Sequence, residues 1–185
     1  MNKNINYGYA LTDYQNLKQE VRNRPGTTEL FNYVESRGFT RLPASLKHHL
    51  STEGGLIIHS MNVVKALQDL TEGLGLIWKD PTSTAIIGIC HDLCKLEFYK
   101  TSPENDRYFV YNDTPEYDLG SHGMLSVVLA QKYIKLTDEE MYCIRFHMGA
   151  YEQKDWSKFD AAIRKYPNVL YTHTADMIAS KILER

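Results

Sequence analysis

Apolar residues recur at intervals of three and four along several stretches of the chain, which is the spacing of a helix with one buried face. The clearest stretch is residues 56–70, where the apolar face is wide. The same spacing predicts helices over residues 6–23, 28–35 and 123–134 and from Pro167 onward. Thr137 followed by Glu140 has the form of a capping box and predicts a helix to about residue 146. The chain is therefore expected to be all-α.

Other stretches break this pattern. Residues 39–55 contain Pro43 and a Gly-Gly pair and are predicted to be irregular around a short helical turn. Residues 107–118 combine an aromatic run with Asn-Asp-Thr-Pro, which favours a small β-hairpin or an ordered loop. Asp80-Pro81 supplies an N-cap and a first-turn proline for the helix expected to carry His91 and Asp92.

Composition indicates one globular domain over residues 1–185, because 43% of the residues are hydrophobic and 24% are charged. The net charge of -2 makes duplex nucleic acid an unlikely partner but allows a small anionic substrate in a local pocket. No apolar run approaches the ~20 residues of a membrane span, and residues 1–7 do not resemble a signal peptide. We expect a cytoplasmic protein without a membrane partner; a homo-oligomer remains open.

The three cysteines, Cys90, Cys94 and Cys143, form no CxxC pair and are odd in number. We expect reduced thiols rather than a disulfide framework. Cys90 and Cys94 flank the polar residues described next, and they are predicted to be small buried side chains rather than metal ligands.

A polar pair interrupts the most apolar stretch of the chain, where Ala-Ile-Ile-Gly-Ile-Cys precedes His91 and Asp92. Burying an imidazole beside a carboxylate is costly unless a partner such as a divalent cation compensates. Polar residues expected to be buried on successive helices complete a set: His59, His91, Asp92, His122, His147 and Asp176. A helical bundle could bring them to one centre. Any single histidine is more often a hydrogen-bonded core or surface residue, so spacing alone leaves the metal hypothesis and that alternative about equal.

Four imidazoles and two carboxylates suit borderline ions such as Mn, Fe, Co, Ni or Zn better than Ca, with Mg also kept open. Six side chains are more than one catalytic ion needs while it keeps open positions. They are enough for two ions that share one bridging carboxylate.

The order of these residues resembles the HD-domain superfamily of metal-dependent phosphohydrolases, in the subgroup with two extra histidines between the HD pair and the last Asp. Local contexts match small bacterial and phage HD hydrolases: Gly-Gly-Leu-Ile-Ile-His59, His91-Asp-Leu-Cys-Lys95, Ile-Arg-Phe-His147-Met-Gly and His173-Thr-Ala-Asp176. The resemblance covers about residues 39–181 as an HD core and leaves residues 1–26 as an N-terminal helical extension.

The resemblance implies ligands for two divalent ions. His59, His91, Asp92 and Asp176 would hold the first ion, and His122 and His147 would hold the second with Asp92 as the bridge. Met148 stands where some relatives have another histidine.

The resemblance also implies hydrolysis of a phosphoester of a nucleotide or related small phosphorylated metabolite by a metal-bound hydroxide. Asp92 and Lys95 are the expected catalytic residues, because a helix would place Lys95 on the face of the HD pair and near the substrate phosphate. His49, Arg145 and His173 are weaker substrate-binding candidates. Residues 39–55 and 99–120 are expected to line the pocket and to select the substrate.

Two other functions stay open. A di-iron HD-type oxygenase would use a similar ligand set, and a non-catalytic HD module would bind a nucleotide and signal. The complete ligand set together with Lys95 favours the hydrolase over the non-catalytic module.

Overall fold

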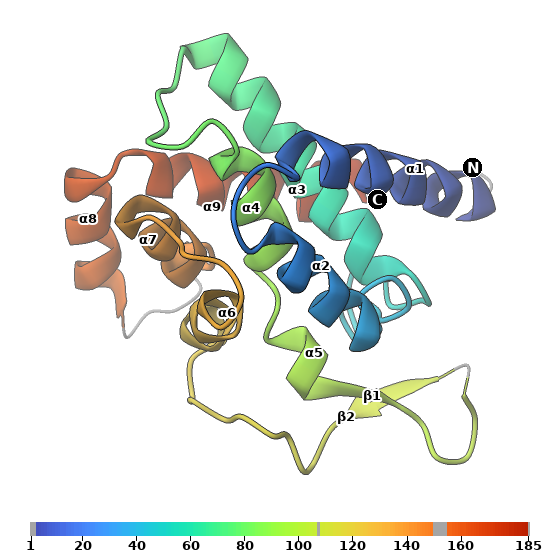
Figure 1. The fold of residues 1–185 in the computed structure, drawn as a ribbon. Helices are drawn as coiled ribbons and strands as arrows, with labels where there is room; N and C mark the ends of the chain where they lie inside the picture. Colours follow the sequence, from blue (N-terminus) through green and yellow to red (C-terminus); the bar gives the residue numbers. More distant parts are fainter. Residues whose placement is uncertain (1–2, 107, 150–154, 185) are drawn as a thin grey trace.

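The computed structural model describes residues 3–106, 108–149 and 155–184, and it is predominantly helical (Figure 1). Its helices are α1 (Lys3–Val21), α2 (Thr27–Ser36), α3 (Gly55–Leu74), α4 (Ser83–Cys90), α5 (Lys95–Phe98), α6 (His122–Gln131), α7 (Asp138–Phe146), α8 (Trp156–Lys165) and α9 (Asn168–Ile178). A π-helical turn, Ala179–Leu183, follows α9, and the strands β1 (Tyr99–Thr101) and β2 (Phe109–Tyr111) form one antiparallel pair. The prediction of an all-α fold is confirmed.

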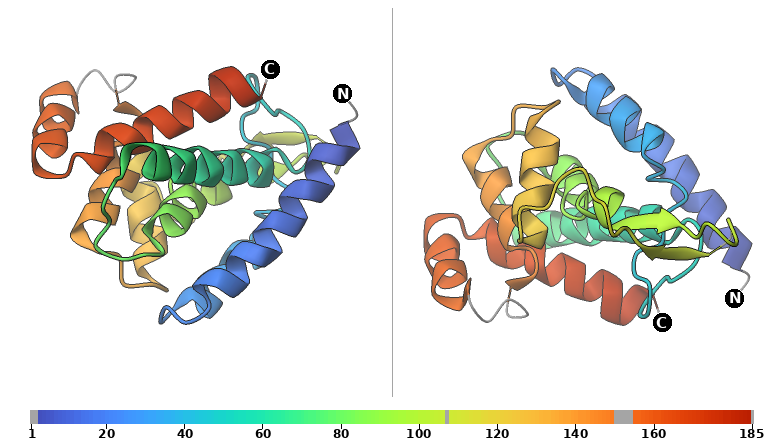
Figure 2. Two further views of the ribbon diagram at one scale, coloured as in Figure 1. Left: turned by 90° about the horizontal axis from the view of Figure 1, so that it is seen from above. Right: turned by 90° about the horizontal axis from the view of Figure 1, so that it is seen from below.

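Helix α3 lies at the centre of the bundle. Figure 2 shows it between α1 and α9, and α4 also packs against it. Helix α7 completes the arrangement by contacting α4, α6, α8 and α9. The core between these helices is apolar, with Leu56, Leu67, Ile86, Ile87 and Leu129 fully buried.

Helix α4 is buried along its whole length, which explains why its sequence has no polar face. Its predicted bounds were wrong at both ends. It begins at Ser83 rather than Pro81, because the Asp80 carboxylate accepts bonds from the backbone and hydroxyl of Thr82 and holds residues 80–82 in a turn. It ends at Cys90, so His91 and Asp92 follow the helix instead of lying within it. The next residues form a tight turn that leads into α5.

The hairpin exists but is displaced from its predicted position. Tyr99 pairs with Tyr111 and Thr101 with Phe109, so β1 precedes the predicted 107–118 segment and only β2 lies inside it. Residue 107 is outside the described residues. Figure 1 shows the hairpin projecting from the bundle beyond α5.

The remaining helices agree with the sequence patterns, apart from α8. Helices α1, α2, α3, α6 and α7 begin and end within a few residues of their predicted bounds, and α9 begins directly after Pro167. The predicted capping box is confirmed, because Thr137 accepts from the Glu140 backbone and the Glu140 carboxylate accepts from the Thr137 backbone. Helix α8 was not predicted. None of the helices in the described ranges is long and apolar enough to cross a membrane.

Candidate metal centre

The six residues predicted as metal ligands converge from distant parts of the chain. His59 lies on α3, His91 and Asp92 follow α4, His122 begins α6, His147 follows α7 and Asp176 lies on α9. Four of these side chains are at most 4% exposed, whereas Asp176 is 16% exposed and His122 is 26% exposed. The bundle therefore assembles the predicted set in one place.

Asp92 lies at the centre of this cluster, and its two oxygens face different histidines. Oδ2 is 3.5 Å from His59 Nε2 and 3.3 Å from His91 Nε2. Oδ1 is 2.6 Å from His122 Nε2 and 3.6 Å from His147 Nε2. A carboxylate in this position can serve two adjacent ligand groups, one through each oxygen.

Two groups have ligand atoms close enough to share an ion. In each of the sets His59–His91–Asp92 and Asp92–His122–His147, the ligand atoms lie within 4.8 Å of one another. Asp176 adds an oxygen to the first set, since its Oδ1 is 3.2 Å from His59 Nε2. Mixed imidazole and carboxylate donors of this kind fit borderline divalent ions.

The orientation of the imidazoles supports ligation rather than ordinary hydrogen bonding. His91 Nδ1 donates to Gly88 O at 2.9 Å and His147 Nδ1 donates to Ile144 O at 2.8 Å, which leaves both Nε2 lone pairs aimed at the centre. His147 Nε2 is buried and has no hydrogen-bond partner among the described residues. A buried polar atom without a partner is costly, and an ion would satisfy it. The residues present therefore fit a metal.

Two glycines allow the helices that carry these ligands to approach closely. A Cβ on Gly88 of α4 would lie 3.0 Å from the backbone of Val64 on α3 and 2.4 Å from its Cγ2. A Cβ on Gly123 of α6 would lie 2.2 Å from the backbone oxygen of Arg145 on α7. The first contact brings His91 to α3, and the second brings α6 to α7.

Burial and neighbouring charges determine the protonation of the cluster in the absence of ions. Burial favours a raised pKa for Asp92, but Lys95 and the histidines hold it well below its usual range. Burial opposes the charge on Lys95, and Asp92 outweighs this and raises its pKa. Burial lowers the pKa of His59, but Asp176 and Glu184 together outweigh it and raise the pKa to about 9. Burial lowers the pKa of His91, which favours the neutral form that binds metal.

The cluster opens into a cavity of about 470 Å³, a size typical of small-molecule sites. Residues 44–49 form one wall, Tyr99 and Tyr111 of the hairpin another, and Met177, Ser180 and Lys181 a third. Parts of the predicted segments 39–55 and 99–120 therefore line it. Lys95 also lines the cavity, and its Nζ is 2.5 Å from Asp92 Oδ2.

The three weaker substrate-binding candidates occupy different positions. His49 lines the cavity, and its ring is 5.1 Å from that of His59. Arg145 lies away from it, pairs with Asp155 and lines a separate cavity between α6, α7 and α8. His173 donates from Nδ1 to His147 O at 2.8 Å, so it contacts the backbone of a predicted ligand rather than the cavity.

The comparison with protein families agrees with this geometry. The HD domain family matches residues 56–179, about two-thirds of the chain. The chain belongs to the HD domain family. Neither the curated proteins nor the solved structures gave a match. Membership in the HD family places the chain in a superfamily of metal-dependent hydrolases, and the clustered ligands are those expected of a metal-binding member.

Sequence reasoning missed Glu184, whose carboxylate is 3.0 Å from His59 Nδ1. Its side chain is 1% exposed although its neighbours Ile182 and Leu183 are largely exposed, so no local pattern indicates that it is buried. The prediction for the cysteines is confirmed, because Cys90, Cys94 and Cys143 are free and buried.

Proposed function

We propose that the protein is a divalent-metal-dependent phosphohydrolase that cleaves a phosphoester of a nucleotide or a similar small metabolite. The observation that carries this proposal is the position of Asp92 between two groups of ligand atoms, at the bottom of a cavity that Lys95 also lines. Two ions are proposed, with His59, His91 and Asp176 on one side of Asp92 and His122 and His147 on the other.

The ions would supply positive charge to the phosphoryl oxygens and lower the pKa of water near neutrality. The residues of the chain have separate tasks. Asp92 orients both ligand groups through its two oxygens. Lys95 keeps a buried positive charge beside Asp92, and we assign it a hydrogen bond to a phosphate oxygen of the substrate, where fixed charge stabilises the transition state.

The hairpin residues that line the cavity favour a substrate with an aromatic base. Tyr99 and Tyr111 are paired across the hairpin with ring centroids 5.7 Å apart, and Tyr111 is 63% exposed at the edge of the cavity. A nucleobase can stack on an exposed tyrosine ring while the phosphate lies near Lys95. Lys47 and Lys181 add positive charge to the cavity walls. We also propose a cytoplasmic location, with which the free cysteines are compatible.

The test is a panel of mono-, di-, tri- and cyclic nucleotides and dinucleotides, each incubated with Mn, Co, Mg, Zn or Fe and with products identified by mass. We expect hydrolysis of at least one member, abolished by Asp92→Ala and retained by Asp69→Ala. Asp69 is a suitable control because it is exposed on α3 and, among the described residues, its ion-pair partner is Lys65 at the surface.

Three results would overturn the proposal. The first is inactivity of the wild type across the panel with every metal. The second is tight nucleotide binding with no turnover, which would indicate a binding module. The third is an iron-filled site in protein purified without oxygen, with oxygen-dependent product formation, which would indicate an oxygenase.

A further inference from the structure

We infer that Glu184 is a positioning residue for the metal centre: it fixes the ring of His59 so that Nε2 faces the ions. The inference rests on the proposed metal site, because it concerns how one ligand of that site is held. Glu184 itself does not contact the substrate cavity.

The geometry places Glu184 behind His59. Its Oε1 and Oε2 lie 3.0 Å and 3.2 Å from His59 Nδ1. The other ring nitrogen, Nε2, faces Asp92 and Asp176 on the opposite side. A carboxylate that accepts from Nδ1 fixes the tautomer in which Nε2 carries the free lone pair.

The other two inward-facing histidines do not need such a partner. His91 and His147 each follow the end of a helix, where the last carbonyls have no helical donor. Their Nδ1 atoms donate to the carbonyls of Gly88 and Ile144, three residues earlier. His59 lies inside α3, where the carbonyls accept bonds from the helix itself, so its ring depends on a side chain from elsewhere.

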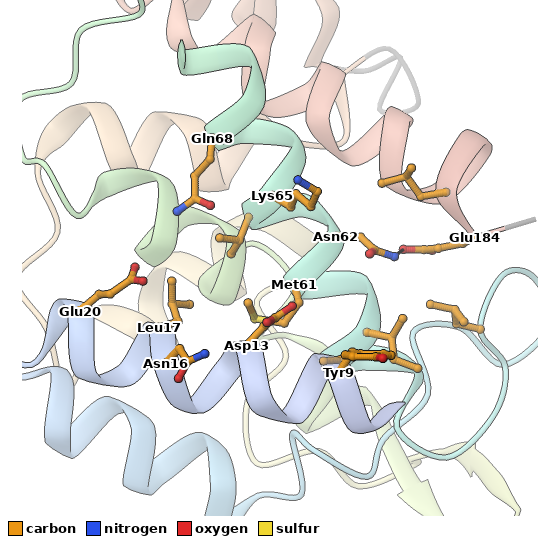
Figure 3. Close-up of a pocket in the computed structure, with 15 residues that line it drawn as sticks. Tyr9, Asp13, Asn16, Leu17, Glu20, Met61, Asn62, Lys65, Gln68 and Glu184 are labelled. Carbon is orange, nitrogen blue, oxygen red and sulfur yellow. Dashed lines mark hydrogen bonds between the residues drawn. The ribbon is translucent and has the colours of Figure 1, made fainter. Parts of the chain in front are cut away.

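Two features hold Glu184 in place. Asn62, three residues after His59 on α3, donates from Nδ2 to Glu184 Oε1 at 3.0 Å. The π-helical turn ends with a bond from the backbone of Glu184 to Ala179 O at 3.2 Å, and this wider turn brings the residue back against α3. Figure 3 shows Asn62 and Glu184 side by side at one end of a groove of about 590 Å³ between α1 and α3.

A direct role of Glu184 as a metal ligand is the competing reading. Ligand atoms of His49, His59 and Glu184 also lie within 4.8 Å of one another. An ion there would bind His59 through Nδ1, while the ion of the main centre would bind the same ring through Nε2. If Glu184 instead accepts a hydrogen bond from Nδ1, the ring binds one ion only. This carboxylate–histidine pair is the common arrangement around metal-bound histidines.

The experiment measures metal affinity by calorimetry and chelator competition, with Mn and Co on metal-free protein, and uses the Co absorption spectrum to report the coordination of His59. Glu184→Ala is expected to weaken the affinity for the ion on the His59 side of Asp92 about 10- to 100-fold. Glu184→Gln keeps an oxygen that can accept from both His59 and Asn62, so it should restore most of the affinity. Glu72→Ala, an exposed glutamate on the same helix as His59, is the control and should bind as the wild type does.

Thermal unfolding of the metal-free variants shows whether each is folded. If Glu184→Ala does not fold, Asn62→Ala tests the same inference by releasing Glu184, with a smaller loss of affinity and a changed Co spectrum. Unchanged affinity in Glu184→Ala overturns the inference, and so does an equal loss in the Ala and Gln variants, which would indicate charge rather than position. If the wild type binds no metal, both the inference and the proposed metal site fail.

Discussion

A buried ion pair joins the N-terminal part of the chain to the helices around the candidate metal centre. Arg24, between α1 and α2, forms two bonds to Glu140 of α7, at 2.6 Å and 2.7 Å. The side chain of Glu140 is fully buried and that of Arg24 is 8% exposed. Glu140 also accepts from the Ser83 hydroxyl and from the Thr137 backbone, so it links α4 and the start of α7 as well.

Glu140→Ala should therefore be strongly destabilising. Within the described ranges, the substitution leaves the buried Arg24 charge with the neutral Thr82 hydroxyl and Lys135 carbonyl and with the more distant Asp80. Removing one member of a buried pair costs about 3–5 kcal/mol. The free energy of unfolding of an ordinary domain is about 5–15 kcal/mol, so much of the stability would be lost. Urea unfolding of metal-free protein at 25 °C, followed by circular dichroism, measures the change.

Two controls distinguish the buried charge from simple loss of contacts. The double variant Arg24→Met/Glu140→Leu removes both charges and should lose much less stability than Glu140→Ala. Lys65→Ala removes an exposed pair with Asp69 and should change stability by less than about 1 kcal/mol. A loss below about 1 kcal/mol in Glu140→Ala would refute the reasoning, because it would mean that Arg24 reaches water without disturbing the fold.

Three further predictions concern the site. Gly88→Ala should destabilise the fold by about 1–3 kcal/mol and weaken metal binding, because its Cβ meets Val64. Gly73→Ala is the control, and it should be neutral or stabilising in the same unfolding assay because nothing lies within 4 Å of its Cβ. Tyr111→Ala should lower kcat/KM for a nucleotide substrate about 10-fold and leave kcat/KM for a non-aromatic phosphoester unchanged. Tyr108→Ala, at another exposed tyrosine, is its control. Equal effects on both substrates would exclude stacking. Chelation should lower Tm by about 5–11 °C relative to protein with metal at 100-fold its Kd, and no shift would contradict ion binding to the folded state.

The sequence was sufficient to predict the helices whose apolar faces are wide and the polar residues that interrupt them. Helix α3 begins within one residue of its predicted start, and His91 and Asp92 are buried as their apolar surroundings indicated. Helix α8 was missed although Trp156, Phe159 and Ile163 recur at intervals of three and four in its sequence, which is the spacing of a helix with one apolar face. Strand β1 is three residues long, and its pairing with β2 depends on the path of the chain rather than on local propensity.

The candidate site was predictable as a set of residue types but not as a geometry. The resemblance implied six ligands, and the bundle brings these six residues together. Nothing in the sequence near Glu184 indicated that it would return to His59, because that contact spans 125 positions and depends on a π-helical turn. The separation of Arg145 from the cavity was equally hidden, since its place on α7 is set by how α7 packs against α6 and α8.

The charges of the cluster also predict that the fold forms without the ions. Asp92 is buried, and an isolated carboxylate there would be severely destabilising. Lys95 neutralises it at 2.5 Å, and the bond from His122 Nε2 at 2.6 Å adds to this. Small domains whose ligands have no such partners unfold when metal is removed. In this protein the apolar core and the Lys95–Asp92 pair are expected to hold the cluster in place before any ion binds. Metal should therefore raise the stability of a folded chain, and its removal should lower Tm without abolishing the helical fold.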